Sequence, residues 1–329
     1  MITDTKVRIV SYIKTNGQAR VKDLVTHLGY GAVAIHRHLK ALVDRGELVK
    51  AGSPPKVFYR LSTAAPKDQK QVDQQVSALL DKYFAYVDPT GHLETGISGF
   101  RLWAQNVSKR DQVDSLLRRY TLDRQSLTPL FSPQGWINAT QNVAKTFSSD
   151  MTLDGIYYLD FYSLPTFGKT RLGSITLYSK QSENRYLMRQ LADEVKPFIV
   201  SLIDHLNVSA VAFLPHSIIR KVQFLKEFSA QLNLPLPTIA LAKAYPGHIR
   251  VAQKTLGKLE ERVTNARETI FVDNPQARYP KVLLIDDAVG SGSTLNETAK
   301  KLKQLGVAKQ VFGFTIVGSL KGFDVIREV

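Results

Sequence analysis

One segment near the end of the chain constrains the fold more than any other, KVLLIDDAVGSGSTLNETAKKL over residues 281–302. It places a short apolar run before two acidic residues, then a loop of small residues, and then the start of a helical pattern. A buried strand that leads through a tight loop into a helix is typical of α/β proteins, in which ligands bind at the carboxyl ends of the strands. Because a helix N-terminus presents free N–H groups to anions, the segment predicts a phosphate-binding site.

The loop residues suit close contact with a phosphate group. Gly290 and Gly292 allow the backbone to approach an anion, and Ser291, Ser293 and Thr294 add hydroxyl donors. The loop has neither the Gly-x-x-x-x-Gly-Lys spacing of ATP-binding loops nor the Gly-x-Gly-x-x-Gly pattern of dinucleotide-binding loops. It therefore belongs to neither of these two phosphate-binding classes.

The C-terminal part of the chain alternates between strand-like and helix-like patterns. Short apolar runs rich in β-branched residues occur at residues 209–214, 238–242, 282–287 and 310–317, and helical patterns occur at residues 185–205, 219–233 and 294–305. Continuous apolar strands between helices predict a parallel sheet that is covered on both faces. Pro197 is expected to break or kink the first of these helices.

Residues 282–294 carry a resemblance to a known family. Four apolar residues, two acids and a small-residue loop that ends in Gly-Ser-Thr resemble the phosphoribosyl pyrophosphate (PRPP) motif of type I phosphoribosyltransferases. The resemblance implies the α/β, parallel-sheet fold of that family for residues 151–329. It also implies that the two acids hold ribose hydroxyls, directly or through Mg²⁺, and that the loop wraps the 5′-phosphate. The implied PRPP-binding residues are Asp286, Asp287, Ala288, Val289, Gly290, Ser291, Gly292, Ser293 and Thr294.

The chemistry of these residues agrees with the resemblance. Paired carboxylates suit vicinal hydroxyls as acceptors, and Mg²⁺, which prefers oxygen ligands, suits pyrophosphate. One departure concerns Gly290, because purine-salvage members of the superfamily carry an aspartate there as a general base. A 6-oxopurine acceptor is therefore less expected, and no catalytic base is visible in the sequence.

Upstream residues extend the resemblance to the ComF-like group of phosphoribosyltransferases. That group has a Gln–Leu–Arg–Asn–Phe segment, which Gln253, Leu256, Arg262, Asn265 and Phe271 resemble at spacings about one residue longer. Where the group has Arg-Gly-Phe-Asn-Gln, this chain has Pro215-His216-Ser217 and then RKVQF, with Lys221 at the glycine.

Two cations follow in that region. Binding a leaving pyrophosphate is electrostatic work, so Arg220 and Lys221 are the pyrophosphate-loop candidates. The alternative is that they are solvated residues at the start of a helix.

The charge of the chain predicts a polyanionic partner. Lys and Arg number 44 against 29 Asp and Glu, which gives a net charge of +15. Residues 1–62 hold eleven basic and four acidic side chains, a net charge of +7. Arg220, Lys221 and the basic segment between Lys243 and Arg267 are the places where the rest of the chain could meet a phosphorylated small molecule.

The N-terminal residues have the pattern of a small α+β domain. Helices are predicted up to Asn16-Gly17, at residues 21–28 and at residues 32–45, and a hairpin at residues 47–51 and 56–61 with a Gly-Ser-Pro-Pro turn. Three helices followed by a two-stranded wing resemble the winged helix-turn-helix of bacterial transcription regulators, and the resemblance covers nearly all of residues 4–62.

This resemblance implies binding to double-stranded DNA. It places Tyr30, His36, Arg37 and Lys40 at the major groove and Lys50, Lys56 and Arg60 on the phosphate backbone. The alternatives are a solvated basic face or a winged helix that binds protein. The charge of residues 1–62 favours DNA.

In the middle of the chain no group of residues suggests a catalytic or binding site. Residues 1–62 are predicted to be the winged helix, 63–70 a linker, 71–150 a helical connecting region and 151–329 the phosphoribosyltransferase-like domain. Helices are expected at residues 71–87, 100–120 and 136–147, and an antiparallel strand pair within 155–180. The helix at 71–87 is a candidate dimerisation element, so a homodimer is expected.

Several classes are excluded by what the sequence lacks. It contains no cysteine, which excludes disulfides, thiolate metal sites and a cysteine nucleophile. It has no signal-like start and no long apolar stretch, so a cytoplasmic chain without a membrane partner is expected. Two functions remain. The favoured hypothesis is a transcription regulator that binds PRPP or a related nucleotide as effector, and the alternative is an active phosphoribosyltransferase with an accessory DNA-binding domain.

Overall fold

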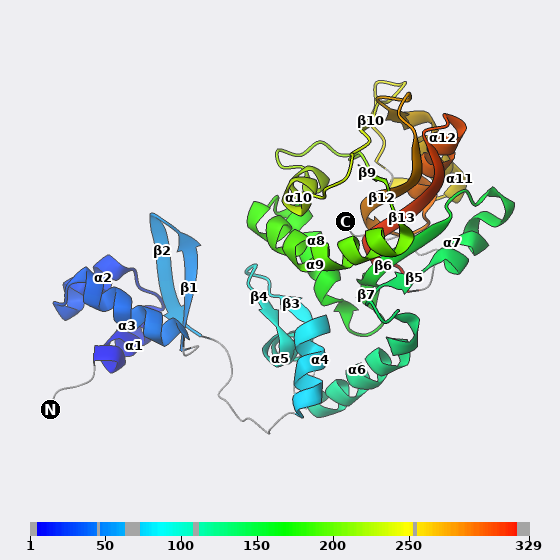
Figure 1. The fold of residues 1–329 in the computed structure, drawn as a ribbon. Coiled ribbons are helices and arrows are strands. Elements are labelled where there is room, and N and C mark those ends of the chain that lie inside the picture. The colour runs from blue at the N-terminus through cyan, green and yellow to red at the C-terminus, as the bar shows by residue number, and fades with distance from the viewer. Residues whose placement is uncertain (1–4, 45–46, 63–72, 108–111, 253–254, 321–329) are drawn as a thin grey trace. The chain divides into compact units, whose positions relative to one another are not determined.

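The computed structural model describes residues 5–44, 47–62, 73–107, 112–252 and 255–320. The chain divides into two compact units, Met1–Gln71 (unit 1) and Val72–Val329 (unit 2). Figure 1 shows the elements of both. The predicted linker at residues 63–70 lies outside the described residues. No helix in the described residues is long and apolar enough to cross a membrane.

Unit 1 consists of three helices and one antiparallel hairpin. These are α1 (Thr5–Asn16), α2 (Val21–Leu28), α3 (Ala32–Asp44), β1 (Leu48–Ser53) and β2 (Lys56–Leu61). Gly17 and Gly29 follow the first two helices with φ of +76° and +72°, the left-handed conformation that ends a helix. The predicted elements are confirmed, except that β1 continues to Ser53 and the turn is confined to Pro54-Pro55.

The core of unit 1 joins all five elements. Apolar residues at helical spacing face inward, and the fully buried ones are Ile9, Ile13, Leu24, Ile35, Leu39 and Leu42. Ala19 and Tyr59 exchange two backbone hydrogen bonds of 2.8 and 2.7 Å, which attach the segment before α2 to the hairpin. The hairpin is therefore fixed to the helices and is not a free arm.

Unit 2 is built on a five-stranded sheet in the order β5-β6-β13-β12-β9. The strands are β5 (Ile137–Asn138), β6 (Gly155–Phe161), β13 (Ala308–Gly318), β12 (Tyr279–Val289) and β9 (Ala210–Phe213). All neighbours are parallel except β5, which pairs antiparallel with β6. The prediction of an α/β fold with a mainly parallel sheet is confirmed.

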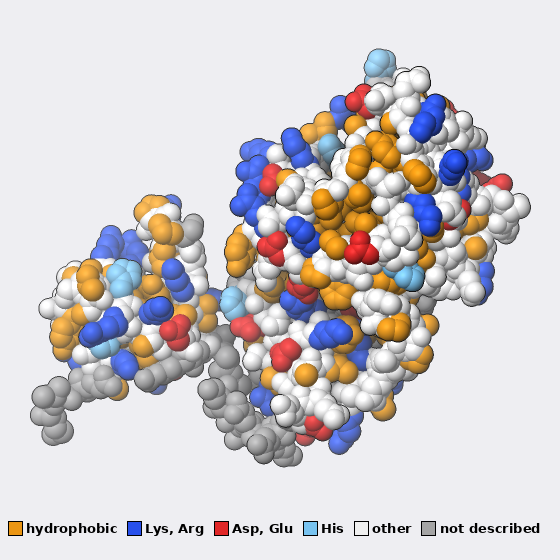
Figure 2. Space-filling view, viewed as in Figure 1, with side chains coloured by type: hydrophobic (Ala, Val, Ile, Leu, Met, Phe, Trp, Pro, Cys, Tyr) orange, Lys and Arg blue, Asp and Glu red, His pale blue; other side chains and the backbone are white. Residues whose placement is uncertain are grey.

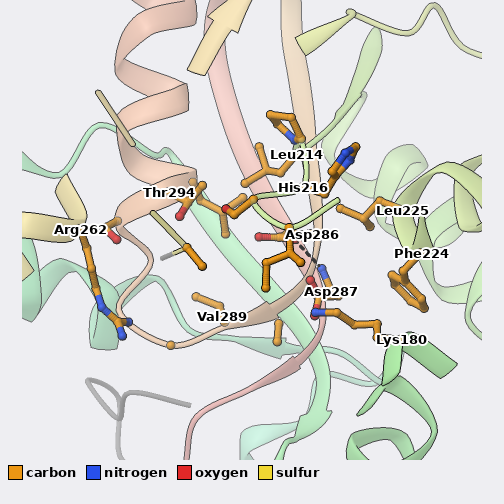
Figure 3. Close-up of a pocket in the computed structure, with 18 of the residues that line it drawn as sticks. Lys180, Leu214, His216, Phe224, Leu225, Arg262, Asp286, Asp287, Val289 and Thr294 are labelled. Carbon is orange, nitrogen blue, oxygen red and sulfur yellow. Dashed lines mark hydrogen bonds and ion pairs between the residues drawn. The ribbon is translucent and has the colours of Figure 1, made fainter. Parts of the chain in front are cut away.

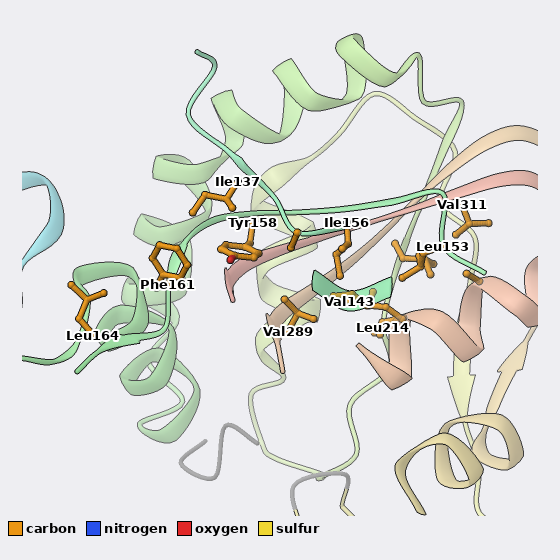
Figure 4. Packing of buried hydrophobic residues seen from close by; sticks show 14 of the residues in the cluster. Ile137, Val143, Leu153, Ile156, Tyr158, Phe161, Leu164, Leu214, Val289 and Val311 are labelled. Atoms are coloured by element: carbon orange, nitrogen blue, oxygen red, sulfur yellow. The ribbon is translucent and has the colours of Figure 1, made fainter. Parts of the chain in front are cut away.

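Helices cover both faces of this sheet (Figure 1). Leu283 and Ile285 face α9 (Arg185–Leu206) and α10 (Phe224–Leu232). The other face carries Val282 and Leu284 and packs against α7 (Thr140–Phe147), α11 (Leu259–Thr269) and α12 (Ser293–Gln304). Figure 4 shows part of the apolar packing on this second face of the sheet. Because both faces are buried, each central strand is a continuous apolar run.

Several predicted elements of unit 2 are wrong in type or extent. Residues 171–181 form helix α8 (Arg171–Gln181), not the second strand of a pair with residues 155–161. Thr170 caps this helix by accepting a hydrogen bond from the Gly173 N–H, 3.1 Å away. The helix is buried on several sides, so its apolar residues show no helical stripe that the sequence could display.

The helical region before residue 150 is more divided than predicted. The helix expected at 71–87 is α4 (Gln74–Tyr83) followed by strand β3 (Ala85–Val87), which pairs with β4 (Leu93–Thr95). The helix expected at 100–120 is α5 (Gly96–Asn106) and α6 (Val113–Leu127), separated after the exposed Val107. Strand β5 precedes the shorter α7 in place of the helix expected from residue 136.

Three further differences concern the C-terminal part. Helix α9 continues through Pro197 without a break. Thr238 makes only an isolated parallel bridge to Val211, and the chain then forms β10 (Leu241–Lys243), which pairs antiparallel with β11 (Ile270–Val272). Helix α10 begins at residue 224 and not 219. The remaining short elements are β7 (Ser163–Leu164), β8 (Gly168–Lys169) and 3₁₀ turns at Thr128–Leu130 and Ser148–Asp150.

Candidate functional site

The candidate site lies where two neighbouring parallel strands end. Strand β12 pairs with β9 in parallel, so the acidic residues of β12 and the segment after β9 meet at the same edge of the sheet. They surround a cavity of about 240 Å³ (Figure 3). All nine residues of the predicted PRPP motif, 286 to 294, line this cavity. The structure therefore brings the whole predicted motif to one site.

Asp286 and Asp287, called the acid pair below, are the acidic residues that line the cavity among the residues that the structure describes. The Asp287 N–H donates to Asp286 Oδ1 at 2.9 Å, and the Asp287 carboxylate forms an ion pair with the ammonium of Lys180. Burial, together with the negative charge of Asp287, raises the pKa of Asp286 well above its usual range. The Asp286 carboxyl group is therefore suited to hydrogen bonding with a neutral polar group such as a hydroxyl.

The small-residue loop enters α12 through a tight turn. Gly292 has φ +78° at the N-cap of the helix, and a Cβ there would lie 2.9 Å from Val143 Cγ1. Ser291 and Ser293 are buried, with their hydroxyl oxygens 3.1 Å apart. The Ser293 N–H makes a long hydrogen bond of 3.4 Å to Ser291 Oγ. The N–H groups of the first turn and these hydroxyls suit an anion at this end of the cavity.

Cationic side chains line the cavity at several points. Arg220 lines it and donates to the backbone carbonyl of Lys180, whereas Lys221 is exposed and is not among the lining residues. Arg262 lies on the opposite side of the motif from Lys180 (Figure 3), and its Nε donates to the Leu256 carbonyl at 2.9 Å. Of the two predicted pyrophosphate-loop cations, only Arg220 is brought to the site.

A second lysine lies behind the segment that follows β9. Lys243 Nζ donates to Ser217 Oγ at 2.8 Å and to Asn265 Oδ1 at 3.3 Å, and Ser217 lines the cavity. Burial lowers the pKa of Lys243 to about 8, although the negative charge of Asp286 acts in the opposite direction. Lys243 therefore connects the ComF-like residue Asn265 to the cavity wall.

The remaining residues of the ComF-like segment are dispersed. Gln253 lies outside the described residues, and Phe271 is 47% exposed on β11. His216 is not part of this segment but follows β9 and also lines the cavity. Burial, and to a smaller extent the positive charge of Arg250, lowers the pKa of His216. Of the four matched residues that the structure describes, Arg262 alone lines the cavity directly.

The donor set does not form a metal cage by itself. No group of three His, Cys, Asp or Glu side chains with metal-binding placement occurs among the described residues. One carboxylate of the acid pair is already bound to an ammonium. Mg²⁺ usually keeps several waters and binds together with substrate phosphates, so a Mg²⁺ ion at this site would be one that arrives with a phosphorylated ligand.

Sequence reasoning missed Lys180 and did not single out Lys243 within its basic segment. Lys180 stands in a segment predicted to be a strand, more than a hundred residues before the motif. Nothing in the local pattern marks it, because its place at the site depends on how α8 packs. Lys243 was visible only as one of many basic residues.

The predicted DNA-contacting residues lie on the surface of unit 1. Tyr30, before α3, and the α3 residues His36, Arg37 and Lys40 are exposed, and the three in α3 share one side of the helix. Lys50, Lys56 and Arg60 are exposed on the hairpin. Figure 2 shows several Lys and Arg side chains on the visible face of this unit.

Comparison with known proteins gives no family for the chain. No family model matches the sequence, and no curated protein matches it. Among solved structures, an adenine phosphoribosyltransferase aligns over 45% of this chain and 78% of its own, with 17% identity and a TM-score of 0.28. A hypoxanthine phosphoribosyltransferase from Staphylococcus aureus aligns over 40% and 66%, with 13% identity and a TM-score of 0.24. Adenine phosphoribosyltransferase from Leishmania tarentolae aligns over 51% and 85%, with 13% identity and a TM-score of 0.26. Scores of this size leave the function to be argued from the site.

Proposed function

We propose that unit 2 is a phosphoribosyltransferase domain, which binds PRPP and transfers its phosphoribosyl group to an acceptor with release of pyrophosphate. One observation carries the proposal. The acid pair, the N-terminal end of α12 and the guanidinium-bearing Arg220 line a single cavity at the carboxyl edge of a parallel sheet. That set provides acceptors for vicinal hydroxyls, a phosphate-binding end and a cation within the space of one small ligand.

Each part of PRPP has a candidate partner in this arrangement. Ser291, Ser293 and the first N–H groups of α12 suit the 5′-phosphate, and the acid pair suits the ribose hydroxyls. Arg220 is the candidate to stabilise the charge that develops on the departing pyrophosphate. When bound with the ligand, Mg²⁺ would neutralise part of the charge on the pyrophosphate oxygens.

The transfer breaks the bond between ribose C1′ and pyrophosphate and forms one between C1′ and the acceptor. Gly290 offers no carboxylate to take a proton from the acceptor. An acceptor that already carries a reactive lone pair therefore suits the site better than a 6-oxopurine. The walls formed by Leu214, Phe224 and Leu225 give the cavity an apolar flank for a planar acceptor.

The test is release of pyrophosphate from PRPP, measured with Mg²⁺ and a panel of nucleobases. Wild-type protein is expected to release pyrophosphate with at least one acceptor. The Asp286→Asn, Asp287→Asn double variant is expected to lose at least about a hundredfold in rate, the effect of removing groups that act on the transition state. Asp273→Asn, at an exposed carboxylate, is the matched control. Absence of pyrophosphate release with every acceptor would overturn the proposal, whether or not calorimetry shows that PRPP binds.

A second candidate function is DNA binding by unit 1, with PRPP or a nucleotide as effector. It is supported by the three helices and hairpin of unit 1, the arrangement of a winged helix, and by the exposed basic residues on α3 and the hairpin. In such domains one helix enters the major groove while flanking cations neutralise phosphates. A homodimer belongs to this candidate, because paired domains read two half-sites.

DNA binding is tested by selecting a preferred duplex and measuring affinity by fluorescence anisotropy over a range of salt. Arg37→Ala is expected to weaken binding to the selected duplex by about 1–3 kcal/mol and to blur its preference. Lys56→Ala is expected to weaken all duplexes alike and to reduce the salt slope by about one. Lys14→Ala, at an exposed residue of α1, is the control. Equal effects of all three variants would remove this candidate.

A further inference from the structure

The ammonium of Lys180 reaches the acid pair from a distant part of the chain. Lys180 is in the last turn of α8 and forms an ion pair with Asp287, 107 residues later. Both side chains are largely buried, with 19% and 14% of their surface exposed. Figure 3 shows them next to each other at the cavity. The contact is therefore part of the site itself and not a surface ion pair.

The surrounding contacts hold this lysine in place. Arg220 donates to the carbonyl of Lys180, which fixes the end of α8 against the segment that follows β9. The backbone N–H of Asp287 donates to Asp286 Oδ1, which orients the Asp286 carboxyl group, while Lys180 holds the Asp287 carboxylate. The ammonium, Asp287 and Asp286 thus form a continuous row along one side of the cavity.

Two adjacent carboxyl groups in a partly buried site can both be ionised only when a positive charge lies beside them, and otherwise one of them stays protonated. In a metal-dependent arrangement a divalent cation supplies that charge and stands between the carboxylates and the hydroxyls. Here an ammonium already lies at Asp287. A Mg²⁺ ion bound directly to that carboxylate would be in repulsive contact with Lys180.

We infer that Lys180 takes the place of a divalent cation at the acid pair, so that ribose hydroxyls bind the carboxyl groups directly. The inference rests on the proposed function and assigns Lys180 as a positioning residue of that site. Mg²⁺ then accompanies only the pyrophosphate of the ligand. A ribose phosphate that lacks pyrophosphate binds without any divalent cation.

Calorimetry with ribose 5-phosphate tests the ligand side of this inference. Wild-type protein is expected to show the same dissociation constant in a chelator and in Mg²⁺. Lys180→Met is expected to bind at least about tenfold more weakly in the chelator, a change of about 1.4 kcal/mol, and to regain affinity when Mg²⁺ is added. Lys180→Arg keeps the charge and should stay independent of Mg²⁺. Lys226→Met, at an exposed lysine of α10, is the control for loss of one positive charge.

Mn²⁺ binding, followed by electron paramagnetic resonance in the absence of any sugar, tests the protein side alone. Wild-type protein is expected to bind no Mn²⁺ at the acid pair, and Lys180→Met is expected to gain a site that Asp287→Asn removes. The inference is overturned if wild-type protein binds Mn²⁺ there or if Lys180→Met gains nothing. Because this readout needs no sugar, it separates failure of the inference from failure of the proposed function, which shows as absent pyrophosphate release.

Discussion

Lys243 is a buried cation whose charge should depend on pH within an accessible range. Burial lowers its pKa to about 8 from an ordinary 10.5, so between these values the unfolded chain binds more protons than the folded one. The free energy of unfolding should therefore rise with pH across this window, by about 1.4 kcal/mol per unit relative to Lys243→Met. The stabilisation is lost as pH falls towards 8.

Tryptophan fluorescence during urea unfolding measures the free energy of unfolding of unit 2, which contains Lys243. The chain has two tryptophans, and both Trp103 and Trp136 belong to unit 2. Lys226→Met, at an exposed lysine, should show no such pH dependence relative to wild type. A difference between wild type and Lys243→Met that stays constant from pH 8 to 10.5 would show that burial does not perturb Lys243.

Gly292 should tolerate no side chain. Alanine at its φ of +78° costs about 1–2 kcal/mol, and its Cβ would also meet Val143 Cγ1 at 2.9 Å. Gly168→Ala is the matched control, because Gly168 has φ +73° with no atom within 4 Å of an added Cβ. We expect Gly292→Ala to lower the free energy of unfolding more than Gly168→Ala and to weaken ribose 5-phosphate binding. Equal unfolding free energies for the two variants would contradict the close packing of the loop.

Whether the sequence can predict a site residue depends on whether local structure or tertiary packing brings that residue to the site. Asp286 to Thr294 are contiguous, so one strand, one loop and one helix start suffice to place them together. Arg220 follows a neighbouring strand, and the resemblance of that segment to the ComF-like group pointed to it. Lys180 reaches the site only through the packing of α8, which depends on contacts distant in sequence. Local pattern carries no information of that kind.

At the level of elements, helix α6 is attached to strand β6 by a buried ion pair. Arg124 Nη1 and Nη2 donate to Asp160 Oδ1 and Oδ2 at 2.7 and 3.1 Å, and both side chains are 2% exposed. Tyr120 and Tyr83 surround the guanidinium. The pair therefore joins the helical region before residue 150 to the sheet, although no sequence pattern linked the two.

Replacing one partner of the Arg124–Asp160 ion pair should destabilise unit 2. Arg124→Met leaves the Asp160 carboxylate buried without its partner and should lower the free energy of unfolding of unit 2 by about 3–5 kcal/mol. Combining Arg124→Met with Asp160→Leu removes the buried, unpaired carboxylate and should recover much of the lost free energy of unfolding. Arg119→Met is the control on the same helix, because its ion pair with Asp123 is largely exposed and should contribute less than about 1 kcal/mol. Tryptophan fluorescence in urea measures all four proteins.

The elements differ in how strongly the sequence marks them. In unit 1 each helix has a separate apolar stripe, and in the sequence a glycine follows within two residues of its end, so the ends of all three helices agree with the prediction within a residue. Helix α8 has the opposite character, since Ser174, Ile175, Thr176 and Leu177 are all buried. A helix covered on several sides has no polar face, and its β-branched and aromatic residues then indicate a strand. Whether such a segment forms a helix or a strand is decided by how it is buried in the tertiary structure.

At the scale of the whole molecule, the charge falls into two parts. Residues 1–62 hold +7 of the net +15, and the remaining +8 is spread over 267 residues. Concentrated charge on an exposed surface suits an extended polyanion, whereas single cations within a cavity suit a small phosphorylated molecule. The two proposed ligands of this chain therefore belong to different units, and the question is whether their binding is coupled.

The two candidate functions make opposite predictions about that coupling. An effector can change DNA affinity only by binding two states of the protein differently, and DNA must then change the affinity for the effector by the same factor. For a regulator we expect PRPP to shift the DNA dissociation constant by about 5- to 150-fold, and DNA to shift that of PRPP equally. The double variant Asp286→Asn, Asp287→Asn should abolish the shift and leave DNA affinity without PRPP unchanged. If both ligands bind without any shift while pyrophosphate is released, the chain acts as a transferase and its DNA-binding unit serves only to place it.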